Sequence, residues 1–203
     1  MTVFINANPH TAQRTVHDNP ARFKVLSAGR RFGKTRLGVT ECLEVASNGG
    51  RAWWVAPSYK ISEVGWRPLR RLASRIPGAE VKLGDKEVVL PNGGAVAVRS
   101  ADAPNGLRGE GLDFVVLDEC AFMREEAWTE ELRPALSDKQ GKALFISTPK
   151  GLNWFWGIFQ RGQAGEEGWA SFKYPTAANP YIEPSEIEAA RADLPELIFQ
   201  QEY

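Results

Sequence analysis

The stretch Ser27–Gly38, "SAGRRFGKTRLG", decides the fold. It contains Gly33, Lys34 and Thr35, which match the end of the phosphate-loop pattern: glycine, four residues, then Gly-Lys-Thr or Gly-Lys-Ser. The pattern places its first glycine at position 28, where this chain has alanine. We interpret Ala28 as a mild departure, because the residue at the end of the strand has to be small more than it has to be glycine.

The residues on either side supply the context that a phosphate loop requires. Residues 22–29 are predicted to form a short buried strand, and residues 35–47 carry apolar residues near helical spacing. Backbone N–H groups at the start of such a helix point at a phosphate. Lys34 would then bridge the β- and γ-phosphates of ATP, Thr35 would hold Mg²⁺, and Gly33 would let the backbone approach closely. The alternative is that Gly-Lys-Thr is an ordinary helix start.

The rest of the chain alternates predicted strands with predicted helices. Strands are expected at residues 51–57, in a hairpin over 86–100, and at 112–119, 142–148 and 169–175. Helices are expected at residues 63–76, where Pro68 marks a late start or a kink, and at 124–136, 153–160 and within 184–201. This alternation predicts the α/β class, with a mainly parallel sheet flanked by helices.

Composition indicates a globular protein with neither a disulfide framework nor a membrane-spanning segment. Hydrophobic residues make up 43% of the 203 residues, which is enough for a sizeable core. Lys plus Arg number 25 and equal Asp plus Glu, so any contact with nucleic acid must use a local basic face. Cys42 and Cys120 are too few for a disulfide framework. No apolar run reaches membrane-spanning length, and residues 1–10 do not resemble a signal peptide.

A second motif, "FVVLDE", covers residues 114–119 and ends an apolar strand in Asp118 and Glu119. A nucleotide hydrolase needs an acid beside the phosphate loop for the Mg²⁺ shell and a base for the attacking water. We assign Asp118 to the metal and Glu119 to the water. The alternative is that the two acids cap the following helix. Both motifs in this order, each ending a buried strand, favour a nucleotide hydrolase.

A third motif, "LFISTPKG", covers residues 144–151. A hydroxyl at the tip of this strand can reach the γ-phosphate or the attacking water, and we assign that role to Thr148. The alternative is ordinary turn chemistry, because Ser, Thr and Pro commonly end strands.

With these pieces placed, the chain resembles the ATPase domain of the large terminase subunit, the DNA-packaging motor of tailed bacteriophages. "AGRRFGKT" (28–35) is similar to its phosphate loop, in which an arginine-bearing loop without the first glycine is typical. "FVVLDECAFM" (114–123) is similar to its second nucleotide motif, and "FISTPKGLNWFW" (145–156) to its coupling motif. The resemblance covers nearly the whole chain. It implies a P-loop NTPase of the ASCE or RecA-like type, with an ATPase core at 1–149 and a lid or linker subdomain at 150–203.

The resemblance also implies roles for individual residues. Gln13 is expected to contact adenine, and Arg30 to contact phosphate or to help sense the γ-phosphate. Arg108 is expected to act as an arginine finger that reaches the ATP of the next subunit, and Arg31 has no firm role. The full set expected to bind nucleotide is Gln13, Ala28, Gly29, Arg30, Arg31, Phe32, Gly33, Lys34 and Thr35. Thr35 and Asp118 are the expected metal ligands, and Glu119, Arg108, Lys34, Arg30 and Thr148 the expected catalytic residues.

The function implied by the resemblance is ATP-driven translocation of double-stranded DNA into the procapsid, with ATP and Mg²⁺ as cofactors. Expected partners are DNA, the portal protein, the small terminase subunit and further copies in a ring. We expect a pentamer during packaging, with a monomer in isolation as the alternative, and no membrane contact. The expected location is the cytoplasm of the infected bacterium at the portal, outside the mature virion.

The sequence also leaves two other functions open. A helicase-type strand-coupled ATPase and a nucleotide-sensing scaffold without hydrolysis remain as other functions. The family's complete protein carries an RNase H-like nuclease domain after the ATPase, which would be expected to begin near Tyr203. We therefore expect no nuclease activity from these 203 residues.

Overall fold

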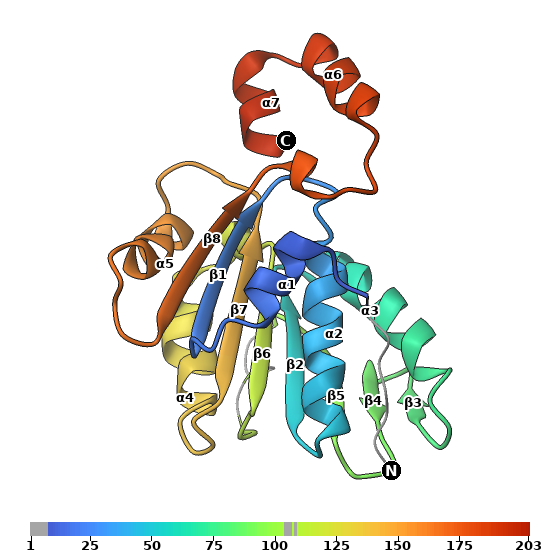
Figure 1. Cartoon of the computed structure of the whole chain (residues 1–203). Coiled ribbons are helices and arrows are strands. Elements are labelled where there is room, and N and C mark those ends of the chain that lie inside the picture. Colours follow the sequence, from blue (N-terminus) through green and yellow to red (C-terminus); the bar gives the residue numbers. More distant parts are fainter. Residues whose placement is uncertain (1–7, 104–106, 108) are drawn as a thin grey trace.

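The computed structural model describes residues 8–103, 107 and 109–203. Its strands form one eight-stranded sheet in the order β3-β4-β5-β2-β6-β7-β1-β8 (Figure 1). They are β1 (Phe23–Ala28), β2 (Arg51–Ala56), β3 (Glu80–Lys82), β4 (Glu87–Val89), β5 (Ala95–Ser100), β6 (Phe114–Asp118), β7 (Lys142–Ser147) and β8 (Trp169–Tyr174). Neighbours from β5 to β8 are parallel, whereas β3 and β4 add an antiparallel edge. The predicted α/β class and mainly parallel sheet are confirmed.

Helices cover both faces of this sheet. On one face lie α1 (Thr11–His17), α2 (Lys34–Ser47) and α3 (Tyr59–Ala73). On the other lie the π-helix η2 (Ala127–Leu132), the short α4 (Arg133–Ala135) and α5 (Trp154–Gln163). Two further helices, α6 (Pro184–Asp193) and α7 (Glu196–Glu202), lie beyond the carboxyl ends of β1 and β8 (Figure 1). In the described ranges, no helix is both long enough and apolar enough to cross a bilayer.

Two hydrophobic cores, one on each face, hold the sheet between these helices. Successive side chains of a strand point to opposite faces, so neighbouring residues enter different cores. Trp53 packs in the core under η2 and α5, whereas Trp54 packs in the core under α2 and α3, and each is 1% exposed. The central strands are therefore buried on both faces, which explains their nearly continuous apolar sequences.

Several elements differ from the sequence predictions. Helix α3 begins at Tyr59, before the predicted start, because the Ser58 hydroxyl accepts a hydrogen bond from the Ile61 N–H (3.4 Å) and caps it. Pro68 lies inside α3 and does not delay its start, since the buried Trp66 and Leu69 anchor the helix on both sides of it. The short elements α1 and β3 were not expected from the sequence.

The sheet continues past the boundary predicted at residue 150. β8 pairs with β1 from Phe23↔Trp169 to Ala28↔Tyr174, and α5 packs against both strands. Residues 154–174 therefore belong to the body of the sheet. The part of the predicted lid that lies outside the sheet is the 3₁₀ turn η3 (Thr176–Ala178) together with α6 and α7.

The packing of α3 on β2 makes a prediction about stability. An alanine Cβ at Gly65 would lie 2.4 Å from two atoms of the buried Trp54 ring. Gly65→Ala should therefore lower the free energy of unfolding by about 1–3 kcal/mol. Gly157 in α5 is the matched control, because a Cβ added there would have no described atom within 4 Å beyond its chain neighbours and the nearby backbone of its own helix. Gly157→Ala should raise the stability by about 0.5–1 kcal/mol. Urea unfolding compares the two, and effects of the same sign would contradict the packing described.

Candidate nucleotide site

The candidate site begins with the loop between β1 and α2, at the carboxyl end of the sheet. Arg31 has φ +60° and Gly33, which precedes the first residue of α2, has φ +99°. These left-handed conformations let the chain turn from the strand into the helix within five residues, 29–33. The N-terminus of α2 therefore opens at the tip of β1, as a phosphate loop requires.

Lys34 lies inside this loop. It is 8% exposed, and its Nζ donates hydrogen bonds to the carbonyl oxygens of Ala28 (2.7 Å) and Gly29 (3.0 Å). Burial lowers the pKa of Lys34, while the charges of Glu119 and Asp118 oppose that shift. The ammonium is thus held by neutral carbonyls and has the two acids nearby, a state from which it can turn toward an anion.

Asp118 and Glu119 occupy the tip of β6, on the strand next but one to β1. Asp118 is 3% exposed, and burial, followed by the charge of Glu119, raises its pKa to about 7. Glu119 has φ +48°, an uncommon conformation for a residue with a side chain, and its N–H donates to Asp118 Oδ1 (3.1 Å). Such backbone strain is found most often at functional sites.

The strand between these two motifs contributes Ser147 and Thr148. Ser147 is completely buried, its hydroxyl donates to Glu119 Oε2 (3.4 Å), and it accepts from the Ala121 N–H (3.4 Å). Thr148 is 6% exposed and lines the cavity described next. Ser147, to which the sequence motifs assigned no role, thus forms a hydrogen bond with Glu119.

A cavity of about 970 Å³ joins these groups. Eight of the predicted site residues line it: Arg30, Arg31, Gly33, Lys34, Thr35, Asp118, Glu119 and Thr148. A further wall is apolar and comes from Val39 of α2 and from Ile61, Val64, Pro68 and Leu72 of α3. The structure therefore brings Lys34 and Thr35 at the start of α2 to the same cavity as the two acids that follow β6.

Other predicted residues lie behind the loop. Phe32 is completely buried, with its ring stacked on Tyr174 at 5.4 Å and edge-on to His10 at 5.0 Å. Ala28 is also completely buried. Gly29 has no room for a side chain, because a Cβ there would lie 2.6 Å from Thr176 Oγ1. These residues shape the loop, and any direct contact of theirs with a nucleotide stays a prediction.

Gln13 lies on α1 and contacts the phosphate loop. It is 3% exposed, its Oε1 accepts from the His10 N–H (3.1 Å), and its Nε2 donates to the Gly33 carbonyl (3.0 Å). The His10 Nε2 lies 2.9 Å from the Phe32 carbonyl oxygen. Gln13 and His10 therefore brace the backbone of the loop, and the expected contact of Gln13 with adenine stays a prediction.

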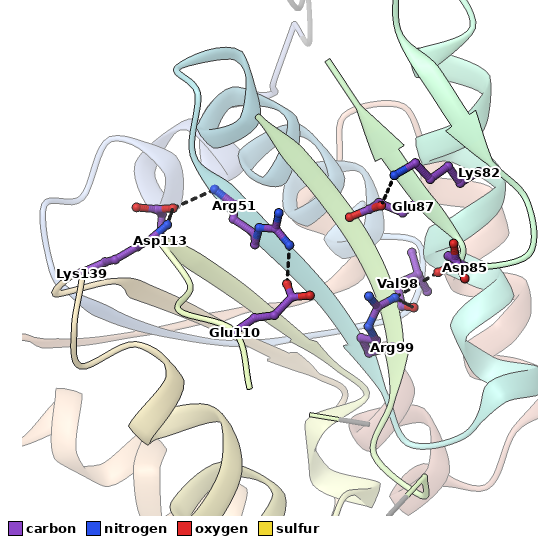
Figure 2. Close-up of polar contacts among 9 residues, drawn as sticks. All are labelled: Arg51, Lys82, Asp85, Glu87, Val98, Arg99, Glu110, Asp113 and Lys139. Carbon is purple, nitrogen blue, oxygen red and sulfur yellow. Dashed lines mark hydrogen bonds and ion pairs between the residues drawn. The ribbon is translucent and has the colours of Figure 1, made fainter. Parts of the chain in front are cut away.

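Arg108 lies outside the described residues, but both of its flanks are anchored. Leu107 is completely buried in the core under η2, and Arg51 Nη1 pairs with Glu110 Oε2 at 2.5 Å (Figure 2). Asp113 accepts from the Arg51 N–H (2.7 Å) and pairs with Lys139 (2.8 Å), as Figure 2 shows. The chain is thus fixed shortly before and shortly after position 108.

The family follows from comparison with known proteins. The sequence model of the family described as "Terminase large subunit, T4likevirus-type, N-terminal" matches residues 25–202. The chain belongs to this terminase family. The large terminase subunit of Thermus virus P23-45 is 35% identical over 96% of this chain and 48% of its own length. That of Escherichia phage T5 is 31% identical over 93% of this chain and 44% of its own length. The chain thus spans about half the length of these relatives.

Solved structures agree with this assignment. The large terminase ATPase domain of Thermus phage P74-26 is 31% identical, has a TM-score of 0.79, and aligns over 97% of this chain and 92% of its own. The large terminase of a thermophilic bacteriophage, solved in complex with ADP, shares the fold at 16% identity and a TM-score of 0.77, over 95% of this chain and 52% of its own. The terminase chain described here therefore has the P-loop NTPase fold predicted from its motifs.

The residues around Asp118 fit the Mg²⁺ ion that the terminase fold implies. Asp118 is a buried carboxylate whose pKa is raised by burial and by the charge of Glu119, and a divalent cation beside it would favour its ionised form. Thr35 offers a hydroxyl in the same cavity, and oxygen ligands of this kind suit Mg²⁺. Within the described ranges, no cluster of three or more His, Cys, Asp or Glu residues could hold a metal. Mg²⁺ sites commonly complete the shell with phosphate oxygens and water.

Proposed function

We propose that this terminase chain is an ATP-hydrolysing motor domain that drives double-stranded DNA into a procapsid. The observation that carries the proposal is the meeting of Lys34 with Asp118 and Glu119 in one cavity at the carboxyl ends of β1 and β6. Parallel α/β sheets bind ligands at this edge. The P74-26 relative, at 31% identity, is described as an ATPase domain, which supports the same activity here.

In the proposed mechanism, Lys34 leaves the carbonyls of Ala28 and Gly29 and binds the β- and γ-phosphates of ATP. Thr35 and Asp118 would hold Mg²⁺, which when bound neutralises charge developing on the phosphates. Glu119 orients the attacking water and accepts its proton as the bond between the γ-phosphorus and the bridging oxygen breaks. The product is ADP and inorganic phosphate.

Further residues support this chemistry in the proposal. Ser147 holds the Glu119 carboxylate, and Thr148 lies where it can respond to loss of the γ-phosphate. Gln13 is proposed to reach adenine, and Arg108 to enter the ATP site of a neighbouring copy. We place the lid at residues 175–203, because residues 154–174 belong to the sheet.

The wider role is proposed from the family. Partners would be double-stranded DNA, the portal protein, the small terminase subunit and further copies in a ring, with the assembly located at the portal in the host cytoplasm. With equal numbers of acidic and basic residues, DNA contact would depend on local basic faces and on phosphate contacts.

Lys34→Ala tests the nucleotide site. Removing the ammonium should weaken binding of ATPγS by roughly 10²-fold, because a charge-assisted phosphate contact contributes about 1.5–3 kcal/mol. Calorimetric titration of ATPγS in the presence of Mg²⁺ measures this affinity. Lys60→Ala is the matched control, an exposed lysine of α3, and should bind as the unmodified chain does. Equal affinities for the Lys34 and Lys60 variants would contradict the proposed phosphate site.

A further inference from the structure

The last turn of α7 is seated directly on the phosphate loop. The Arg30 N–H donates to the Glu202 carbonyl oxygen (2.6 Å), and Arg30 Nε donates to Glu202 Oε2 (2.5 Å). Thr176 joins the two segments, since its N–H donates to the Tyr203 carbonyl (2.7 Å) and its hydroxyl donates to the Arg30 carbonyl (2.7 Å). Figure 1 shows α7 above the tip of β1. Two hydrogen bonds thus join Arg30 to Glu202, which lie 172 positions apart in the sequence.

The side chain of Glu202 therefore places a negative charge inside the nucleotide cavity. Glu202 lines that cavity, and its charge acts on Lys34 together with those of Glu119 and Asp118. Its side chain is 19% exposed, whereas that of Arg30 is 68% exposed. Three carboxylates thus surround a site whose proposed ligand is a polyphosphate.

The pair between Arg30 and Glu202 shares its cavity with Glu119. The pKa of Arg30 is raised mainly by its hydrogen bond with Glu202, and the charge of Glu119 contributes to the same shift. Arg30 thus lines the cavity that also holds the acid that we propose to orient the attacking water. Water attacks the γ-phosphate, so this is the end of the site where ATP carries a group that ADP lacks.

We propose that Glu202 sets the preference of this site between ATP and ADP by competing with the γ-phosphate for Arg30. The γ-phosphate and the carboxylate are both anions, and a single guanidinium neutralises only one of them well. ATP therefore competes with Glu202 for the charge of Arg30, whereas ADP does not. The inference rests on the proposed ATPase function and adds a residue that sets nucleotide specificity from outside the sequence motifs.

Glu202→Gln separates the charge from the backbone contact. The glutamine keeps the backbone carbonyl of position 202 that accepts from Arg30 and removes only the negative charge. Binding of ATPγS should tighten by roughly fivefold, the modest value expected for a pair with one exposed partner, and by more than binding of ADP, which lacks the γ-phosphate. Glu188→Gln, an exposed glutamate of α6, is the matched control and should leave the ratio of the two affinities unaltered.

Calorimetric titration of ATPγS and of ADP into the 203-residue chain measures the ratio of the two affinities. Melting curves check the fold, and Glu202→Ala, which should shift the ratio in the same direction, replaces the glutamine variant if that variant does not fold. An unchanged ratio, or equal tightening of both nucleotides, would overturn the role of Glu202 and leave the proposed function standing. Failure of the unmodified chain to bind either nucleotide would instead overturn the proposed function.

Discussion

Glu119→Gln should bind ATP with the affinity of the unmodified chain and lower its turnover by roughly 10²–10⁴-fold, the usual contribution of a general base. The amide has the size of the carboxylate but cannot accept the proton of the attacking water. The structure fixes the side chain for this task, because Glu119 follows β6 in a left-handed conformation and its Oε2 accepts from Ser147. The nucleotide would still be held by Lys34 and the amino end of α2.

Single-turnover hydrolysis and calorimetry together measure this effect. Glu125→Gln is the matched control, an exposed glutamate six positions farther along the chain, and should hydrolyse ATP at the unmodified rate. Turnover at the unmodified rate in the Glu119 variant would remove this residue from the mechanism. Loss of both binding and turnover would show that Glu119 holds the nucleotide instead of activating water.

Arg108→Ala should lower the ATPase rate of the assembled complex by roughly 10³-fold, the lower end of the range for an arginine finger. A finger has to be presented at a defined position, and here the anchors are Leu107 in the core and the pair between Arg51 and Glu110. Gly109, the next residue along the chain, has φ +96°, a left-handed conformation that favours glycine. The rate is measured as phosphate release by the complex on DNA.

Mixing two inactive variants tests whether Arg108 acts between copies. Arg108→Ala retains Glu119, and Glu119→Gln retains Arg108, so a mixed assembly contains sites that combine an intact base with a neighbour's intact arginine. Partial recovery of activity on mixing is expected. A finger that acts within its own chain gives no recovery, and Arg14→Ala, an exposed arginine of α1, should be fully active.

The sequence predicted the elements that hold the site because its signals are local. Gly33-Lys34-Thr35 and Asp118-Glu119 each follow an apolar run, and the carboxyl ends of parallel strands share one edge of a sheet. The structure adds that β7 lies between β1 and β6, which places Ser147 against Glu119. Strand order depends on packing over the whole sheet, and no short pattern records it.

The other features that the sequence did not predict also depend on contacts that no short motif records. Helix α1 depends on a capping box between His10 and Gln13, in which histidine replaces the usual serine or threonine. β8 lies at an edge of the sheet beside β1, so the sequence boundary after residue 149 did not coincide with the end of the core. Glu202 gave no signal, because its contact with Arg30 joins segments at opposite ends of the chain.

Release of inorganic phosphate from ATP is the measurement that shows whether this site hydrolyses ATP. We expect the 203-residue chain with Mg²⁺ to release phosphate, and Lys34→Ala and Glu119→Gln each to reduce this release to background. A chain that binds ATPγS but releases no phosphate, even when assembled on DNA with Arg108 intact, would contradict hydrolysis at this site. Equal release by the unmodified chain and by both variants would contradict it as well.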